Sequence, residues 1–454
     1  MRLTNAAALP GENAAWLGQF DVDVGSGETH RYFLPLALSF APEAIGAGSP
    51  VLGYTLAKVR RGARIGPLYD ATADEQFPQA MMAAMAAGTE IAARGGKYRF
   101  VAGKALATLA PADQRKVQRL SVEQSNTSIV VNERAMFKVY RRLAAGIQPE
   151  IEVGRHLTEV AGYANTPPYL GHVDFVADDG TTTAVAVAQG FVASQGDGWA
   201  VTTEYLKREI ETLLLNPDAA APGPHAIYAS FLVRIATLGR RIAGLHRALA
   251  LGDNSAFKPE PMPHDYFSTL GDAVAKQVGI ACETLARADK HIDDATRADV
   301  QLLTSNKERL RAFLREVLPT EARVIGTRLH ADLHLGQVLA VQNDWYVLGL
   351  EGEPVRLLSE RRGKGPPAKD VASMLRSFDY AARFVAADRA RVVPNSGPDA
   401  ERHALGWRDA ARTVFVHAYD QNSANAPGFA DDEGLRKRLI DLYAFEKAVY
   451  EITY

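Results

Sequence analysis

One short segment of the chain combines residue types that could carry out phosphoryl transfer. It runs His330-Ala-Asp-Leu-His-Leu-Gly-Gln337, and its Asp332 and Gln337 are five residues apart. In that chemistry an Asp accepts the proton of the attacking hydroxyl, and an amide oxygen five residues later holds a Mg²⁺ ion. The alternatives are a zinc site on His330 and His334 or two core histidines, and His-x-Asp-x-His alone is weak evidence for zinc. The spacing favours Asp332 as the proton acceptor and Gln337 as a metal ligand.

Phosphoryl transfer from a nucleotide also needs a lysine on a strand, preceded by a loop that covers the phosphates. Lys138 lies within the apolar run 136–140, where a single ammonium is costly unless it meets an anion. A snorkelling lysine and an ordinary hairpin turn are the alternatives. The turn before this strand has no Gly-x-Gly pattern and offers small polar side chains and backbone amides instead, at Ser125, Asn126, Thr127 and Ser128.

Two further features follow in chain order. A predicted helix opens with two acids, of which we select Glu152 as the partner of the lysine, with Glu150 as the alternative. Both could equally be charges that favour a helix N-terminus. The apolar run 184–188 then ends at Gln189 and Phe191, where backbone groups could meet the edge of an adenine. We therefore predict Gln189 and Phe191 as nucleotide contacts.

The elements that must position these residues change in type along the chain. Alternating runs predict an antiparallel sheet that carries one helix near residues 76–92, and a second sheet that begins near residue 117. Beyond residue 199 the spacing is mostly helical. The long predicted helices are 226–251, 270–288 and 297–318, and a β-hairpin is predicted to turn at Asn343 and Asp344.

Composition sets the limits of this interpretation. The chain has 454 residues, 51 Lys and Arg against 53 Asp and Glu, and a net charge of −2, so no global field recruits nucleic acid or an anionic membrane. Its single cysteine, Cys282, suits a reducing compartment. No stretch reaches the ~20 apolar residues of a membrane helix. We therefore expect a cytoplasmic protein without nucleic-acid or membrane partners.

The chain resembles the maltokinases, bacterial sugar kinases of the aminoglycoside-phosphotransferase, protein-kinase-like superfamily, and especially those fused behind a trehalose synthase. The matching segments cover nearly the whole chain: residues 123–128, 138–143, 150–158, 189–192 with 195–199, 330–339, 351–354, 370–381 and 445–451. The resemblance implies an α+β, bilobal, protein-kinase-like fold. Its parts would be a β-rich cap (1–115), an N-lobe with a mixed sheet (116–195) and a mostly helical C-lobe (196–454).

The resemblance also implies an activity and its partners. It is the ATP-dependent phosphorylation of maltose at its anomeric hydroxyl, giving maltose 1-phosphate in the route from trehalose to α-glucan, with Mg²⁺ as the metal. A trehalose synthase would be a partner, in fusion or in complex. Lys138 would hold the α- and β-phosphates.

Three departures from the family pattern bear on that activity. The family has a metal-binding Asp where this chain has Gly349, and we expect Glu351 to compensate because alternate residues of a strand share a face. Ala331 replaces a glycine, which strains the loop if that position needs a positive φ. Both ends are also shorter than those of relatives, which is expected of a fragment or an alternative start.

An acceptor sugar needs carboxylates and amides for its hydroxyls and an aromatic face for its rings. The candidates are His334, Asp379, Tyr380, Glu446, Lys447 and Glu451, and Tyr443 and Tyr450 share the last helix. A solvated or helix-packing face is the alternative for each of them.

Two other functions remain open at this point. One is a kinase-like regulatory or scaffolding module that lost its chemistry with the carboxylate at position 349. The other keeps phosphoryl transfer but uses an aminoglycoside, glucosamine or another sugar as the acceptor.

Overall fold

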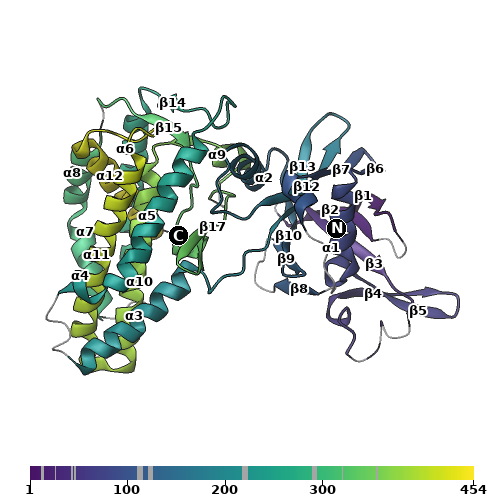
Figure 1. The fold of residues 1–454 in the computed structure, drawn as a ribbon, viewed down its shortest axis with the longest axis horizontal. Coiled ribbons are helices and arrows are strands. Elements are labelled where there is room, and N and C mark those ends of the chain that lie inside the picture. The colour runs from purple at the N-terminus through teal and green to yellow at the C-terminus, as the bar shows by residue number, and fades with distance from the viewer. Residues whose placement is uncertain are drawn as a thin grey trace. The chain divides into compact units, whose positions relative to one another are not determined.

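The computed structural model describes residues 1–11, 15–25, 27–41, 44, 46, 48–109, 116–120, 126–216, 223–288, 294–319, 321–353 and 356–453. The chain divides into two units, residues 1–193 with 355–361 and residues 194–354 with 362–454. Most strands belong to the first unit and most helices to the second, which confirms the predicted α+β class (Figure 1). The predicted boundary between cap and N-lobe, at residue 115, lies inside the first unit.

The first unit begins with a six-stranded antiparallel sheet. Its main path runs β1-β2-β3-β5-β4, and the short β11 pairs with β3. The inward positions of β3, including Phe33 and Ala37, alternate with more exposed ones, as expected for a sheet with one buried face. The strands are β1 (Arg2–Ala8), β2 (Trp16–Asp23), β3 (Thr29–Leu38), β4 (Thr55–Arg61), β5 (Arg64–Asp70) and β11 (Arg142–Leu143).

A seven-stranded antiparallel sheet completes the first unit, in the order β6-β7-β12-β13-β10-β9-β8. Its outer strands β6 and β7 come from the segment predicted as cap, yet β7 pairs with β12 along seven residues, from Gly171 to Ala177. The strands are β6 (Glu90–Ala93), β7 (Gly96–Ala102), β8 (Val117–Leu120), β9 (Asn126–Val131), β10 (Ala135–Tyr140), β12 (Tyr169–Ala177) and β13 (Thr182–Gly190).

The helix predicted near residues 76–92 is shorter than expected. Helix α1 spans Gln76–Ala86, and the chain then turns at Gly88, whose φ is +61°, into strand β6. Glycine reaches this left-handed conformation without steric cost, so the turn stops the helix although the alanine-rich sequence would continue it. Helix α2 (Pro149–Arg155) follows β11 and ends in a π-turn at His156–Val160.

One apolar core joins both sheets of the first unit. Phe77 of α1 meets Phe137 of β10 edge to face, with ring centroids 6.3 Å apart, and both side chains are buried. Phe33 of β3 and Val187 of β13 belong to the same buried cluster. Each fully buried side chain of this size contributes roughly 1.5–3 kcal/mol, so the two sheets stabilise one another.

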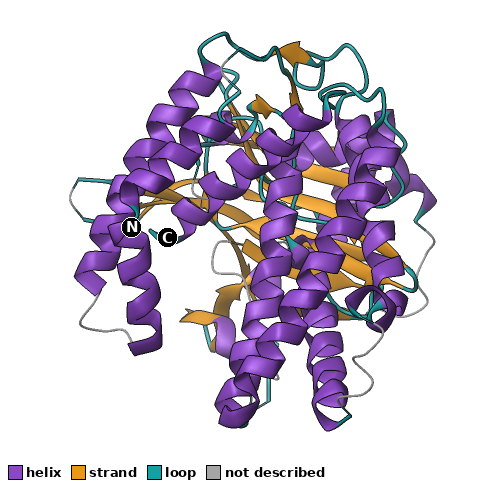
Figure 2. Cartoon of the chain, turned by 90° about the vertical axis from the view of Figure 1, so that its left-hand side faces the viewer, coloured by secondary structure: helices purple, strands orange, loops and turns teal. Residues whose placement is uncertain are grey.

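The second unit is built mainly of helices (Figure 2). The predicted helix 297–318 is two helices, α7 and α8, because the chain leaves helical geometry at Asn306. The helices of this unit are α3 (Gly198–Leu215), α4 (Pro224–Ile227), α5 (Ala229–Leu249), α6 (Tyr266–Ala288), α7 (Asp294–Ser305), α8 (Lys307–Val317), α10 (Ala368–Val392), α11 (Gly397–Ser423) and α12 (Glu433–Glu451), whereas α9 (Leu358–Arg361) belongs to the first.

The predicted hairpin is confirmed within this unit. Strands β16 (Val338–Val341) and β17 (Asp344–Val347) pair antiparallel, and their loop is Gln342 and Asn343, one residue earlier than predicted. Short β14 (Glu260–Pro261), β15 (Ile325–Arg328) and β18 (Lys364–Gly365) form a separate small sheet. Among the described residues, no helix has the length and apolar character needed to span a membrane.

Candidate phosphotransfer site

Lys138 is buried in the middle of the seven-stranded sheet. It lies on β10 between Ser128 of β9 and Val187 of β13, and its Nζ is 3.3 Å from Glu150 Oε2. The Tyr140 hydroxyl donates a 2.7 Å hydrogen bond to the same carboxylate oxygen. A buried carboxylate and ammonium stabilise each other only when each also has further polar partners, as Glu150 has here. The ion pair therefore uses Glu150, the alternative acid, whereas the selected Glu152 is only partly buried.

The predicted phosphate contacts divide between the two faces of the sheet. Ser128 lies opposite Lys138 and Asn126 opposite Tyr140, so both share the face of the lysine. Thr127 points to the other face, where its hydroxyl accepts a 2.8 Å hydrogen bond from Arg141 Nε. The side chain of Thr127 therefore does not fit a phosphate contact beside the lysine. Ser125 lies outside the described residues.

The end of β13 is already hydrogen-bonded within the first unit. The Phe191 amide donates to the Arg134 carbonyl at 2.8 Å, and the Gly190 amide donates to the Pro168 carbonyl at 2.7 Å. Gln189 is paired in the sheet, opposite Met136. The backbone donors of Gly190 and Phe191 thus already have partners within the first unit, and Gln189 and Phe191 remain nucleotide contacts only as a prediction.

In the second unit, Asp332 lies in a loop, residues 329–337, that follows β15 and ends in the 3₁₀ turn Leu335–Gln337. Ala331 has a φ of +70°, which confirms the expected strain at the position that carries glycine in the family. The buried Asp370 at the start of α10 holds this strained backbone. Its two carboxylate oxygens accept from the amides of His330, at 2.8 Å, and Ala331, at 2.9 Å.

The same carboxylate anchors two histidines. His246 of α5 lies 3.1 Å from Asp370, and its other ring nitrogen is 2.8 Å from the Tyr419 hydroxyl. Burial alone would raise the pKa of Asp370, but the hydrogen bond and charge of His246, with those of His330, hold that pKa below its usual value. His330 meets the Leu348 carbonyl at 2.6 Å and the Asp332 amide at 3.4 Å. Both ring nitrogens are used, so His330 is a core histidine and not half of a zinc site.

The carboxylate of Asp332 itself is held more loosely than its backbone. Its Oδ1 lies 3.8 Å from Lys447 Nζ on α12, and its Oδ2 lies 3.9 Å from His334 Nε2. His334 also accepts a 3.0 Å hydrogen bond from the Gly336 amide, and burial lowers the pKa of this imidazole. A partly exposed carboxylate on a rigid loop, next to one cation, is suited to orient a hydroxyl and take its proton.

Gln337 and Gly349 are packed against each other. Gly349 has a φ of +65°, and a Cβ built on it would lie 2.0 Å from Gln337 Oε1, so the amide fills the space of the missing side chain. Strand β17 ends at Val347, and residues 349–351 lie in a turn region. The expectation that Glu351 shares a strand face with position 349 is therefore wrong, and Glu351 remains a metal ligand only as a prediction.

The chemistry of the donor set decides whether Mg²⁺ fits here. In the described part of the chain, no group of three or more His, Cys, Asp or Glu side chains could hold a metal unaided. Mg²⁺ in phosphotransfer sites is usually held by one or two carboxylates, with phosphate oxygens and water completing its shell. Gln337 offers an amide oxygen, a hard donor of the kind that Mg²⁺ accepts, and it remains a predicted ligand of an ion that a nucleotide would bring.

Most of the predicted sugar residues form charge networks along α10 and α12. Lys369 pairs with Glu446 at 3.4 Å, and Arg376 pairs with Glu451 at 3.1 Å.

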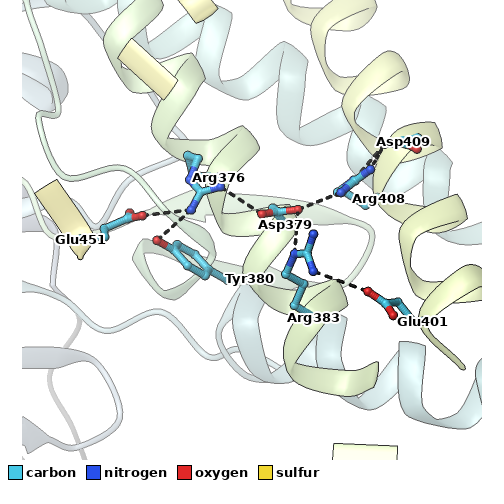
Figure 3. A network of polar contacts seen from close by, with 8 residues as sticks. All are labelled: Arg376, Asp379, Tyr380, Arg383, Glu401, Arg408, Asp409 and Glu451. Atoms are coloured by element: carbon cyan, nitrogen blue, oxygen red, sulfur yellow. Dashed lines mark hydrogen bonds and ion pairs between the residues drawn. The ribbon is translucent and has the colours of Figure 1, made fainter. Parts of the chain in front are cut away.

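Figure 3 shows that Arg376 also reaches Asp379, at 3.0 Å, and the Tyr380 hydroxyl, at 3.3 Å. Asp379 in turn contacts Arg408 at 3.0 Å and Arg383 at 3.8 Å. The carboxylate of Asp379 is therefore already engaged in contacts between side chains of the helices, and its role as a sugar ligand stays a prediction.

Sequence reasoning missed Glu150 as first choice, and it missed Asp370, His246 and Arg376. Arg376 could have been found, since it precedes Asp379 and Tyr380 by three and four residues on a predicted helix. Asp370 gave a weaker signal, an acid in the first turn of a helix, which usually only favours the helix N-terminus. His246 had no local signal, because its partner is far away in sequence.

Comparison with known proteins shows what the chain as a whole is similar to. No family model matches the chain. A glucosamine kinase of Streptacidiphilus jiangxiensis is 25% identical over 342 residues, 73% of this chain and 68% of that protein. A glucosamine kinase of Mycolicibacterium smegmatis is 27% identical over 303 residues, 66% of each. A solved glucosamine kinase, in complex with glucosamine, ADP and inorganic phosphate, has 20% identity and a TM-score of 0.67, and covers 100% of this chain and 89% of that one.

These findings show the fold and support one class of protein. The structural match shows that the chain has the kinase-like fold. The sequence matches add that it is related to glucosamine kinases, which supports a phosphotransferase. They do not confirm membership of the maltokinases.

Proposed function

We propose that this protein is an ATP-dependent phosphotransferase that phosphorylates a hydroxyl of a small sugar. The observation that carries the proposal is the presentation of Asp332. Its backbone is fixed by the buried Asp370 through the neighbouring amides, while its carboxylate is partly exposed beside Lys447. An Asp held in this way can orient the acceptor hydroxyl and accept its proton.

The other residues take roles that follow from their charge and burial. Lys138 is a cation fixed by Glu150, suited to hold the α- and β-phosphates of the nucleotide. The amide of Gln337 would hold the metal. When bound, Mg²⁺ supplies neutralisation of the phosphate charge. Lys447 places a positive charge 3.8 Å from the carboxylate that would accept the proton.

The charges around Asp332 favour an acceptor without a positive charge. Asp332, Glu446 and Glu451 each already face a basic side chain: Lys447, Lys369 and Arg376, respectively. The ammonium of an amino sugar would have to displace one of these cations. Maltose is the neutral acceptor that the sequence resemblance implies, although the comparisons support neither maltose nor a trehalose synthase partner. Glucosamine is the acceptor named for the relatives.

The test is coupled ADP release with maltose, glucose and glucosamine, with Mg²⁺ or Mn²⁺. We expect sugar-dependent release by the wild type and a loss of about 10³-fold in Asp332→Asn, with nucleotide binding unchanged. Asp399→Asn, which changes an exposed carboxylate on α11, is the matched control and should keep full activity. Unchanged turnover in Asp332→Asn would contradict the role of Asp332 as proton acceptor. A preference for glucosamine would contradict the proposal of a neutral sugar acceptor.

A second candidate function is a kinase-like module that binds nucleotide without turnover. The observation that favours it is Gly349, where no side chain is present and the Gln337 amide fills the space. This candidate predicts ATP binding but no ADP release with any of these sugars. Activity that appears only in Gly349→Asp would support it, and robust turnover by the wild type would exclude it.

A further inference from the structure

The first unit contains a cavity on the face of the seven-stranded sheet opposite to Lys138. Its volume is about 480 Å³, within the range of small-molecule sites. Thr127 of β9 and Arg141, which follows β10, line it, and Arg119 of β8 joins them. Arg119 lies opposite Ile129 in the sheet, so it shares the face of Thr127. Its lining from this sheet is therefore mostly on the face opposite to Lys138, although Asn126, which shares the face of the lysine, also contributes to it.

Two guanidinium groups in this cavity share one carboxylate. Arg141 Nη2 lies 2.6 Å from Asp70 Oδ2, and Arg119 Nη1 lies 3.7 Å from the same oxygen. The other oxygen of Asp70 already accepts from the amide and hydroxyl of Thr72, at 3.0 and 2.8 Å. The cluster of Arg119, Arg141 and Asp70 therefore carries one surplus positive charge. A second anion would balance it.

Both arginines also have hydrogen-bonding capacity left over. In the described part of the chain, Nη1 of Arg119 and Nη1 of Arg141 are buried and have no hydrogen-bond partner. Burial lowers the pKa of Arg141, the charge and hydrogen bond of Asp70 oppose this, and the nearby charge of Arg119 adds to the lowering. A buried donor without a partner is destabilising, and a small adjustment of either side chain would let an anion accept from it.

The opposite wall of the cavity is apolar and aromatic. Phe20, Tyr32 and Phe33 of the six-stranded sheet line it. Arg119 is itself stacked on an aromatic ring, with its guanidinium carbon 4.3 Å from the centroid of Tyr54. A free inorganic anion would use the arginines but leave the aromatic wall without a partner. A ligand with both an anionic group and an apolar ring would use both.

We propose that this cavity is a binding site for a small molecule that carries a phosphate or carboxylate on an apolar ring. The anion pairs with Arg119 and Arg141, which hold it in the bidentate way that guanidinium groups favour. The ring lies against Phe20 and Tyr32. The site requires neither nucleotide nor sugar, so it does not depend on the proposed phosphotransferase activity.

Isothermal titration calorimetry with the full chain tests the proposal, with saturating ADP present to occupy the nucleotide site. The probes are phenyl phosphate and benzoate, which separate the two sources of negative charge, with phenol and inorganic phosphate as partial ligands. We expect saturable binding of at least one ring anion with a Kd below about 1 mM. Phenol and inorganic phosphate should each bind at least about tenfold more weakly.

The matched variants locate the binding. Arg119→Gln should weaken the ring anion by about tenfold or more, because it removes the less constrained guanidinium. Arg99→Gln changes an arginine of the same sheet that pairs with Asp174, outside the residues that line the cavity, and should bind like the wild type. If Arg119→Gln does not fold, as judged by circular dichroism, Arg119→Lys takes its place. It keeps the charge but lacks the paired N–H donors of the guanidinium, and it must also weaken binding.

Three results would overturn the proposal. They are no saturable binding of either ring anion, equal affinity for inorganic phosphate alone, and equal losses in the Arg119 and Arg99 variants.

Discussion

Lys138 of the first unit and Lys447 of the second each lie beside a carboxylate, and their surroundings differ. Lys138 is 3.3 Å from Glu150, and the two side chains are only 11% and 5% exposed. Lys447 is 3.8 Å from Asp332, with side chains 30% and 20% exposed. The first pair is part of a sheet and its core, whereas the second joins a helix to a loop.

The difference matches what each pair would meet in a reaction cycle. A lysine that receives the phosphates of every nucleotide gains from a fixed position, because its orientation then needs no rearrangement. A carboxylate that takes the proton of a new substrate hydroxyl in every turnover must be able to exchange its neighbours. We therefore expect the buried pair to matter for stability and the exposed pair to matter mainly for activity.

The largest effect should come from removing one partner of the buried pair. Lys138→Met leaves Glu150 buried without its cation, and we expect the free energy of unfolding to fall by about 3–5 kcal/mol. Lys447→Met removes the corresponding cation from the exposed pair and should cost less than about 1 kcal/mol. Urea denaturation of both variants measures the two values. Equal losses would break the distinction between the pairs.

Asp370→Asn separates the role of the Asp332 carboxylate from that of the Asp332 backbone. Asp332 has a loosely held carboxylate on a backbone that Asp370 holds firmly, so loosening the backbone should reduce kcat by about 10²-fold. Asp388→Asn, on the same helix but at the surface, is the control and should leave kcat unchanged. A kcat within threefold of the wild type in Asp370→Asn would contradict the positioning role.

The same variant makes a prediction about pH. The folded protein depresses the pKa of Asp370, so this group contributes stability that is fully present above the unfolded pKa of about 3.9. That contribution disappears as the pH falls through the lower, folded pKa. The unfolding free energy of the wild type should therefore decline more steeply below pH 4 than that of Asp370→Asn. Parallel curves in acid denaturation would argue against it.

The smallest effect concerns the side chain that fills the space beside Gly349. Gly349→Ala places a Cβ against Gln337 on a left-handed backbone, and we expect a loss of about 1–2 kcal/mol. Gly62→Ala has a similar φ, +60°, but meets nothing within 4 Å, so it measures the backbone cost alone. In the double variant of Gly349→Ala with Gln337→Ala, the loss of unfolding free energy should fall to that of Gly62→Ala. An excess that persists would show that Gln337 is not the group in conflict.

The sequence was most informative where the chemistry is local. Asp332, Gln337 and the hairpin after them lie within one short segment, and the lysine strand was visible as a charge inside an apolar run. The choice between Glu150 and Glu152 was not local, because both lie in one helical turn and only the packing of Tyr140 against Glu150 selects between them. The face of Thr127 likewise depends on strand register, which residue types alone do not define.

Long-range pairing was the other limit. Nothing in residues 90–102 indicates that they pair with β12 rather than with the strands before them. The networks of Asp370 with His246, and of Arg376 with Glu451, join residues more than seventy positions apart. Such contacts follow from how helices and strands pack, so single-residue patterns cannot predict them.

The pairing of β11 with β3 has a practical consequence for dissecting this protein. The chain that leaves the Lys138 strand at Arg141 becomes an edge of the six-stranded sheet, where the Phe33 amide donates to the Arg141 carbonyl at 2.8 Å. A truncation that begins at residue 116 would delete β3, which pairs with β11, and β7, one of the two partners of β12. It would leave two unprotected strand edges and half of a shared core, which is the pattern of an aggregating fragment. Shortened versions for crystallisation or domain exchange should therefore keep the first 115 residues attached.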